Sequence, residues 1–328
     1  RKFIDMYAGR LRNQVSFMLS ACNFYMPIFE EALDAYGLPL ELRYLPIIES
    51  ALNPSAVSRA GASGLWQFMI GTGKIYGLES NSLVDERRDP IKATWAAARY
   101  LKEMYDIYGD WNLVIAAYNC GPGTINKAIR RANGETDYWK IYNYLPKETR
   151  GYVPAFIAAN YVMTYYCDHN ICPMETNIPA STDTVQVNKN LHFEQIADLC
   201  NVPLDQIKSL NPQYKKQMIP GDSKPYTLRL PIDAISTFID KQDTIYAHRA
   251  DELFRNRKTV AVKEITPSTR KTTTAVAGKG KLTYYTIKSG DTLSTIAGKY
   301  GVTIKDIQRW NGMSNTKIAA GKRLKIYK

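Results

Sequence analysis

Residues 49–69 read ESALNPSAVSRAGASGLWQFM, and this stretch decides how the first half of the chain is interpreted. Apolar residues recur at helical spacing just before Glu49, so we expect a helix that ends near Ser50 and is stopped by Asn53-Pro54. A carboxylate in the last helical turn faces the negative end of the macrodipole, and apolar neighbours remove water from it. Both effects favour the protonated form, so the pattern predicts that Glu49 is a general acid near neutral pH.

Small and polar residues follow this carboxylate. Gly61 and Gly64 allow backbone turns and the close approach of a ligand, while Ser58 and Gln67 offer donors and acceptors for hydroxyl and acetamido groups. Such a loop suits a sugar, although an isolated Glu-Ser pair is far more often an ordinary helix end. Other segments of the chain must therefore decide between the two interpretations.

Further motifs occur in order after Glu49-Ser50. They are Asn53 to Ser58, Gly61 to Met69, Ala116-Ala117-Tyr118-Asn119-Cys120-Gly121-Pro122-Gly123 and Gly151-Tyr152-Val153-Pro154. In order and spacing these segments resemble the motifs of the soluble lytic transglycosylases, which are relatives of goose-type lysozyme. The Trp in Gly-Leu-Trp-Gln, taken with the C-terminal modules described below, is most similar to the membrane-bound type D branch of that family.

The resemblance implies a reaction for Glu49. It would protonate the glycosidic oxygen between N-acetylmuramic acid and N-acetylglucosamine of peptidoglycan and then act as base, while the muramyl C6 hydroxyl attacks and leaves a 1,6-anhydromuramyl end. The resemblance also implies the substrate-binding residues Ser50, Ser58, Gln67, Met69, Tyr118, Asn119 and Tyr152, with Tyr152 bonded to Glu49 or to the substrate.

This reaction departs from the usual scheme of two carboxylates. The motif segments contain no second acidic residue after Glu49, which agrees with that departure. A carboxylate from elsewhere, such as Asp85, Glu86 or Asp89, could still approach in space. A lysozyme-like hydrolase that uses water and an inactive peptidoglycan-binding scaffold therefore stay open as alternatives.

Length and periodicity predict an α+β multidomain protein. Apolar spacings of three and four run through residues 1–177, so we expect a mainly α-helical, lysozyme-like catalytic domain with helix ends near Gly37, Gly109 and Gly134. Residues 282–328 read as strand, helix, helix and strand. Their segment Ser289-Gly290-Asp291-Thr292-Leu293 and the residues Ile296, Ile307, Asn311 and Gly321 resemble the LysM module, which binds N-acetylglucosamine-containing glycans.

In LysM modules the ligand lies between two loops. The resemblance therefore implies glycan binding by Gly290, Asp291, Thr292 and Leu293, together with residues near Met313 to Ile318. The alternative is that these loops only cap and connect the secondary structure.

A second copy of the module occurs at an offset of 100 residues. The matching residues are Ile196, Val202, Ile207, Asn211 and Gly221. Residues 178–232 therefore predict a degenerate LysM-like module. It departs from the pattern because Leu191-His192-Phe193 replaces Asp291-Thr292-Leu293, and because about four extra residues precede Leu228. Glycan binding by this copy and a packing or spacer role are equally open.

Residues 233–281 separate the two modules. Asp233 to Phe254 is expected to form a helix, and the Lys-, Arg- and Thr-rich segment up to Lys281 is expected to be a flexible tether.

Positive charge is concentrated near the C terminus. The chain has a formal net charge of +12; residues 241–328 hold 19 Lys or Arg and 6 Asp or Glu, whereas the first 240 residues hold 24 and 25. No nucleic-acid recognition motif accompanies this basic segment. We therefore expect no nucleic acid as a partner, whereas the resemblance implies peptidoglycan glycan strands. Attraction to an anionic envelope surface and simple solubility are equal explanations of the charge.

Cysteine and histidine content bears on metals and on the compartment. The five cysteines include Cys167 and Cys172, which could form a local disulfide in an oxidising compartment. His169 lies between them, but no second ligand pair has zinc-like spacing, so we expect no metal and no cofactor.

The chain starts at Arg1 and has no apolar run long enough to span a bilayer. The expected location is the periplasm of a Gram-negative cell envelope, with membrane association only through a lipid anchor on a missing N-terminus, at the outer membrane. We expect a monomer.

Overall fold

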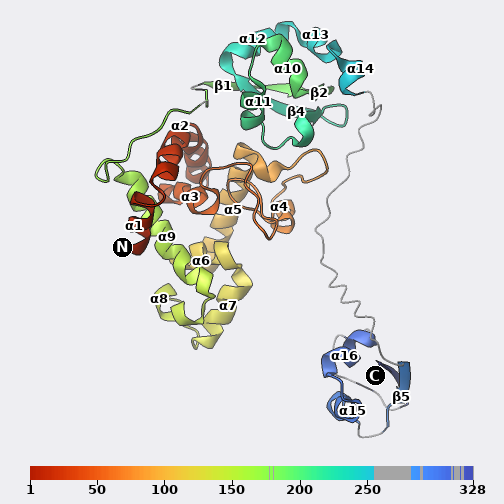
Figure 1. The fold of residues 1–328 in the computed structure, drawn as a ribbon. Helices are drawn as coiled ribbons and strands as arrows, with labels where there is room; N and C mark the ends of the chain where they lie inside the picture. The colour runs from red at the N-terminus through yellow and green to blue at the C-terminus, as the bar shows by residue number, and fades with distance from the viewer. Residues whose placement is uncertain are drawn as a thin grey trace. The chain divides into compact units, whose positions relative to one another are not determined.

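The computed structural model describes residues 1–176, 178–179, 181–254, 282–288, 291–311, 313, 318 and 321–327. They form two compact units, Arg1–Pro267 and Ser268–Lys328 (Figure 1). The expected tether lies almost wholly outside the described residues. In the part of the chain that is described, no helix is long and apolar enough to cross a membrane.

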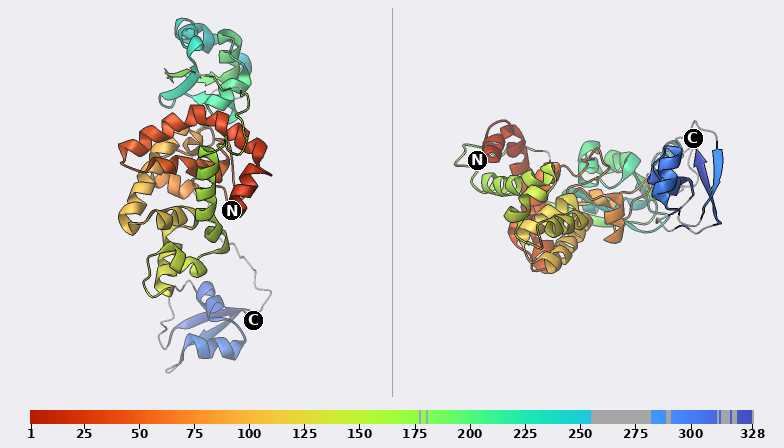
Figure 2. Two further views of the ribbon diagram at one scale, coloured as in Figure 1. Left: turned by 90° about the vertical axis from the view of Figure 1, so that its left-hand side faces the viewer. Right: turned by 90° about the horizontal axis from the view of Figure 1, so that it is seen from below.

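The first unit opens with a helical domain. Its elements are α1 (Lys2–Ala8), α2 (Arg12–Ala35), η1 (Leu40–Tyr44), α3 (Leu45–Ser50), α4 (Ile70–Ile75), η2 (Glu86–Arg88), α5 (Pro90–Tyr108), α6 (Trp111–Cys120), α7 (Pro122–Arg131), α8 (Tyr138–Ile141), η3 (Tyr142–Tyr144) and α9 (Lys147–Thr164). Helix α2 packs on α5, α5 on α6, and α6 on α9, while α1 and α3 also pack on α9 (Figure 2). The expectation of a mainly helical first domain is confirmed.

Local sequence signals account for the boundaries of α5 and α6. Asp89 accepts hydrogen bonds from the backbone N–H groups of residues 91 and 92, and Pro90 occupies the first helical position, where its missing N–H costs nothing. Gly109 ends α5 with a φ of 62°, which a residue without Cβ adopts readily. Asp110 then caps α6.

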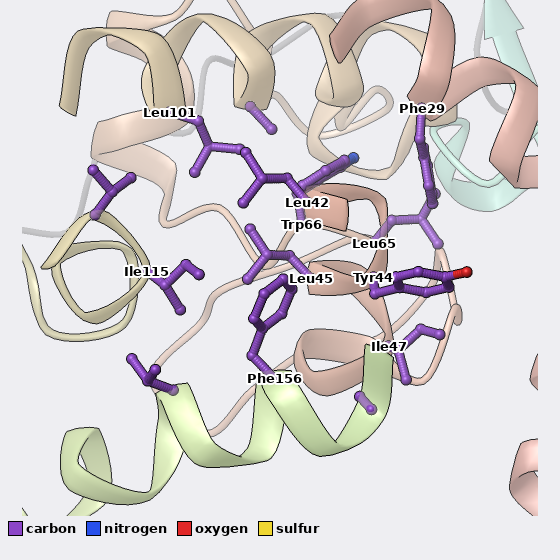
Figure 3. Close-up of a cluster of buried hydrophobic side chains, with 14 of the residues drawn as sticks. Phe29, Leu42, Tyr44, Leu45, Ile47, Leu65, Trp66, Leu101, Ile115 and Phe156 are labelled. Atoms are coloured by element: carbon purple, nitrogen blue, oxygen red, sulfur yellow. The ribbon is translucent and has the colours of Figure 1, made fainter. Parts of the chain in front are cut away.

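A single apolar cluster holds this domain together. Side chains from η1, α3, α5, α6, α9 and the loop before α4 meet in it, among them Leu42, Leu45, Trp66, Leu101, Ile115 and Phe156 (Figure 3). Trp66 is fully buried, and its indole N–H donates to Thr94 Oγ1 at 2.9 Å. The buried indole is therefore paired and pins the loop that follows Glu49 to helix α5.

A LysM-like module follows within the same unit. It contains β1 (Thr182–Val187), β2 (Asn190–His192), α10 (Phe193–Cys200), α11 (Leu204–Leu210), η4 (Lys215–Gln217), β3 (Met218–Pro220), β4 (Tyr226–Pro231), α12 (Ile232–Asp240), α13 (Gln242–Ala247) and α14 (Ala250–Leu253). Strand β1 pairs antiparallel with β4, and β2 with β3. Ala234, Phe238 and Ile245 belong to the module's apolar cluster, so its core extends beyond residue 232 into α12 and α13.

The single helix expected from Asp233 to Phe254 is wrong. Three short helices cover this range because the chain turns at Lys241 and again after His248. The buried Gln195 amide donates to the carbonyl oxygens of Tyr246 and His248, at 3.1 and 2.7 Å. A tertiary bond thus takes carbonyl groups that a continuous helix would have used.

The second unit contains the C-terminal module. It has β5 (Leu282–Thr286), α15 (Leu293–Tyr300), α16 (Ile304–Trp310) and β6 (Arg323–Tyr327), and β5 pairs antiparallel with β6. Thr292 and Thr303 cap the two helices through their side chains. The β-α-α-β order is confirmed.

The two modules share one pattern of asparagine hydrogen bonds. Asn211 donates to the carbonyl oxygens of Ile207 and Arg229 and accepts from the Arg229 N–H, and Asn311 makes the same three bonds with Ile307 and Lys325. The strand partner lies 18 residues after Asn211 but 14 after Asn311, which locates four extra residues in the first copy.

We expect Asn211→Ala to lower the free energy of unfolding of the first unit by about 1–3 kcal/mol, because it leaves buried backbone groups of Arg229 without partners. Asn311→Ala should act in the same direction on the second unit. Urea unfolding of the full chain checks both, with Asn126→Ala, at an exposed site, as a control expected to change stability by no more than about 0.5 kcal/mol. An Asn211→Ala variant as stable as that control would contradict the shared role.

Candidate active site

Glu49 lies at the end of α3, where the chain turns sharply. The helix ends at Ser50, as predicted, and the chain turns there because Ala51 and Leu52 both adopt left-handed backbone angles, with φ of 51° and 58°. Such angles cost non-glycine residues about 1–3 kcal/mol each, and packing of the fully buried Leu52 stabilises the turn. The turn leads the chain away from Glu49 and leaves the carboxylate beside a pocket.

The Tyr152 hydroxyl donates a hydrogen bond to Glu49 Oε1. Tyr152 lies in α9, two residues before Pro154, which has no N–H to bond the carbonyl of Arg150. The Tyr138 hydroxyl takes up that carbonyl at 3.1 Å. This part of α9 is thus held by a side chain in place of a helix bond, and it presents Tyr152 to Glu49.

Burial raises the pKa of Glu49 to about 7. The Tyr152 hydrogen bond acts against this rise, and the negative charge of Glu148 adds to it. Burial and the charge of Glu49 also hold the pKa of Tyr152 well above its usual value, so Tyr152 stays a donor. A carboxyl group with a pKa near 7 is poised to give a proton at neutral pH and to take one back.

The loop after Glu49 folds on itself and bonds to α3. The Ser50 hydroxyl lies 2.9 Å from the Leu65 carbonyl oxygen, and Ser58 Oγ accepts the Ala62 N–H at 3.0 Å. The Gln67 amide donates to the Gly64 carbonyl oxygen at 2.9 Å. Ser50, Ser58 and Gln67, expected to bind substrate, therefore also hold the loop in shape.

A pocket of about 430 Å³ opens beside the carboxylate. It brings together four of the expected site residues: Glu49, Ser50, Ser58 and Gln67. Tyr7 and Gln14 also line it, although the sequence analysis did not select them because they come from α1 and α2, far from any motif. An apolar wall with a few polar groups suits a sugar ring.

The other expected residues do not line this pocket. The Tyr118 hydroxyl donates to the Trp66 carbonyl oxygen at 2.7 Å, and Asn119 Oδ1 accepts from the Thr149 hydroxyl at 2.8 Å. Met69 is 45% exposed at the start of α4. Tyr118 therefore holds the loop that precedes α4, and Asn119 joins α6 to α9.

The carboxylates that could have approached Glu49 have other partners. Asp85 bonds to Arg87, Glu86 pairs with Lys92, and Asp89 caps α5. The acidic group that acts on Glu49 is Glu148, one helical turn before Tyr152 in α9. Glu148 precedes Tyr152 by four residues, so the two side chains lie on one face of a helix. This spacing was the sequence signal that could have placed Glu148 near Glu49.

The C-terminal candidate site has structural contacts of its own. Asp291 Oδ2 accepts from the Tyr285 hydroxyl and the Lys288 N–H, both at 2.8 Å. Thr292 caps α15 and Leu293 is buried in the module's core, while Gly290 lies outside the described residues. Asp291 and Thr292 are the described members of this set with side-chain atoms at the surface.

The described residues contain no cluster of metal ligands and no disulfide. No three His, Cys, Asp or Glu side chains of that part gather as metal ligands. All five cysteines lie in it and are unbridged, Cys167 and Cys172 included.

Two substitutions should move the pH profile of turnover in opposite directions. The acid form of Glu49 is lost as pH rises through its pKa. Tyr152→Phe removes the bond that lowers this pKa, so the alkaline limb should move to higher pH; Glu148→Gln removes a repelling charge, so it should move to lower pH. Turnover measured from pH 4 to 9 at low salt checks both, and a shift of the same sign in both variants would contradict the assignment.

Comparison with known proteins identifies the domains. Residues 26–141 match the transglycosylase SLT domain, residues 181–247 match the LysM-like domain of lytic transglycosylase MltD, and residues 285–326 match the LysM domain. The chain is 33% identical over 296 residues to the membrane-bound lytic murein transglycosylase D of Escherichia coli K12, covering 88% of this chain and 60% of that protein.

Two other similarities are more local. The soluble lytic murein transglycosylase of Escherichia coli K12 is 33% identical over 124 residues, which cover 36% of this chain and 19% of that protein. The structure of the 70 kDa soluble lytic transglycosylase from Escherichia coli aligns with 44% of this chain and 24% of its own, at 29% identity and a TM-score of 0.38.

Fold and site thus define a multidomain protein with a helical domain, a pocket carboxylate, a module of two strand pairs and two central helices, and a smaller β-α-α-β module. The chain combines a transglycosylase SLT domain with an MltD-type LysM-like domain and a LysM domain.

Proposed function

We propose that the protein is a peptidoglycan lytic transglycosylase that cleaves the bond between N-acetylmuramic acid and N-acetylglucosamine and forms 1,6-anhydromuramyl ends. The observation that carries this proposal is Glu49, which lies in the matched SLT domain and whose pKa is raised to about 7 beside a pocket.

The proposed reaction needs one carboxyl group in two states. Glu49 gives its proton to the glycosidic oxygen as the bond to the anomeric carbon breaks. The carboxylate then takes the proton of the muramyl C6 hydroxyl, whose oxygen bonds to the same carbon. No water is consumed and the enzyme returns to its starting protonation state. Tyr152 orients the carboxyl group throughout by its hydrogen bond.

The products test this proposal directly. Purified sacculi are incubated with the protein, and the soluble products are analysed by mass spectrometry. Anhydromuropeptides support the transglycosylase. Products heavier by one water would mean that water attacks, as in a hydrolase, and the absence of products would favour a binding scaffold.

We propose further that the C-terminal LysM module retains the enzyme on glycan strands in the periplasm. The protein would associate with the membrane through a lipid anchor outside this chain. The similarity to a membrane-bound transglycosylase supports this part of the proposal. A binding module tied to a catalytic domain raises the local substrate concentration.

Deletion of residues 256–328 should weaken retention on insoluble sacculi at least about tenfold, because the second binding site is lost. Turnover of soluble fragments should persist, since the Glu49 pocket is in the other unit. Co-sedimentation with sacculi measures the first effect and product release from soluble fragments the second. Unchanged sedimentation would contradict the retention role.

A further inference from the structure

The loop of residues 79–89, here called the bridging loop, joins two helices of the helical domain but contributes apolar side chains to the core of the LysM-like module. It leads from α4 to α5 in the helical domain. Its residues Leu83 and Val84, however, are buried in the apolar cluster of the LysM-like module. Val84 pairs with Tyr214 in a β-bridge, and the Asp85 N–H donates to the Gln213 carbonyl oxygen at 2.9 Å.

Polar and charged side chains of the module also bond to the bridging loop. Lys224 pairs with Glu79 at 2.6 Å, and the Tyr226 hydroxyl donates to Glu79 Oε1 at 3.0 Å. Lys215 Nζ donates to the Asn81 carbonyl oxygen at 2.8 Å and lies 3.7 Å from Asp85. All three side chains lie between Asn211 and Arg229, the interval in which this copy is four residues longer than the C-terminal one.

On the other side, Arg87 of the bridging loop holds the substrate loop. Its guanidinium makes two bonds to Asp85, at 2.9 and 2.8 Å, and one nitrogen donates to the carbonyl oxygens of Gly61 and Phe68, at 2.8 and 2.9 Å. Arg87 and Asp85 are 5% and 1% exposed. These two carbonyl groups flank Gln67, which lines the pocket with Glu49.

The chemistry of this pair explains why it is stable in a buried place. Burial alone would raise the pKa of Asp85, but the bonds from Arg87 and the nearby charge of Lys215 outweigh it and hold the pKa below its usual value. A buried ion pair is stable when its remaining polar groups are satisfied, as they are here by the two carbonyl oxygens. Lysine has no planar fork and could not make the same four contacts.

We propose that the LysM-like module is a fixed part of the catalytic unit and that Arg87 is a positioning residue, which transmits the docking of the module to the substrate loop of residues 61–68. The module's departures from the glycan-binding pattern fit this role. Leu191 and Phe193 are buried, and His192 caps α10, so none of the three is left to contact a glycan. The effect on turnover rests on the proposed function, whereas the effect on the loop does not.

Three full-length variants test this proposal. Arg87→Lys keeps the charge but loses the fork. Lys215→Met removes a cation on the module side, and Lys189→Met is its matched control, because among the described residues Lys189 pairs with Asp243 and the Tyr246 ring, both of the module. The measurements are amide hydrogen exchange of residues 61–68 and the kinetics of cleavage of soluble peptidoglycan fragments.

We expect Arg87→Lys and Lys215→Met to increase exchange in residues 61–68, Arg87→Lys by about tenfold or more, while Lys189→Met leaves it unchanged. Arg87→Lys should also lower kcat/KM about 10–100-fold with a raised KM, because a displaced loop misplaces substrate contacts. Partial unfolding alone would reduce the active fraction and leave KM unchanged. The thermal unfolding midpoint identifies a variant that has simply lost its fold.

Wild-type exchange in residues 61–68 of folded Arg87→Lys and Lys215→Met would overturn the proposal. So would an equal increase in Lys189→Met. If the wild-type protein cleaves no peptidoglycan, the proposed function fails, but the exchange measurements still decide whether the module holds the loop.

Discussion

Glu49→Gln is expected to reduce cleavage of sacculi by about 10²–10⁴-fold, the range that a positioned general acid and base contributes. Glutamine keeps the shape of the side chain and can still accept the Tyr152 hydrogen bond, but it has no proton to give at neutral pH. Mass spectrometry of soluble products from wild type and variant measures the loss. Activity near that of the wild type would remove Glu49 from the mechanism.

The same substitution has a stability signature that shows whether the variant is folded. The pKa of Glu49 is about 7 in the folded protein against 4.5 in the ordinary state. Between these values the folded state holds a proton that the unfolded state has lost, so wild-type stability falls as pH rises through this window. Glutamine does not titrate.

The midpoint of thermal unfolding of Glu49→Gln should therefore rise relative to wild type between pH 4.5 and about 7 and keep that gain above it. The loss of cleavage and the gain in stability both follow from one buried carboxyl group. It supports turnover and lowers the stability of the folded protein. A constant difference across the whole range would mean that the pKa of Glu49 is not raised.

Gly64→Ala should strongly destabilise the substrate loop. Gly64 has a φ of 89°, and a Cβ there would lie 1.7 Å from the Arg87 carbonyl oxygen. The left-handed angle alone costs roughly 1–3 kcal/mol, and the clash with backbone adds the cost of overpacking, so we expect a loss of about 3 kcal/mol or more. The loop must shift, and cleavage should be lost with it.

Gly61→Ala is the matched control. Gly61 has nearly the same φ, 88°, but no atom lies within 4 Å of the place where its Cβ would be. This variant carries the backbone strain without the clash, so its loss should stay within roughly 1–3 kcal/mol. Urea unfolding and cleavage of soluble fragments compare the two. Equal losses in stability would show that close packing of Gly64 on Arg87 is not the reason for glycine there.

The predicted elements that proved correct rest on local physics. Helix ends at Gly37 and Gly109 follow from a backbone that only glycine adopts cheaply, and both have a φ of 62°. The order of strand, helix, helix and strand in the C-terminal module followed from the apolar period, and the second of these helices, α16, spans Ile304–Trp310. The correspondence between the two module copies was also visible in the sequence, because Asn211 and Asn311 recur at the offset of 100 residues.

Only some residues of the candidate site could be predicted from the sequence. Glu49 and its raised pKa were predictable, since a helix end and apolar neighbours act within a few residues. Tyr152 was expected near Glu49 only through the resemblance, because 103 residues separate them. Tyr7, Gln14 and Glu148 were missed, since each reaches the pocket or Glu49 by the packing of α1, α2 and α9 on one another.

By itself, then, the sequence determined the order of domains, the candidate acid Glu49 and the small-residue loop beside it, because these depend on short-range spacing and backbone preference. Only the tertiary structure decided what holds that loop. Asp85 and Arg87 are only two residues apart in the sequence. Their ion pair nevertheless joins Gly61 and Phe68 to Gln213 and Lys215. Contacts between segments so far apart depend on the packing of whole domains, which no local pattern encodes.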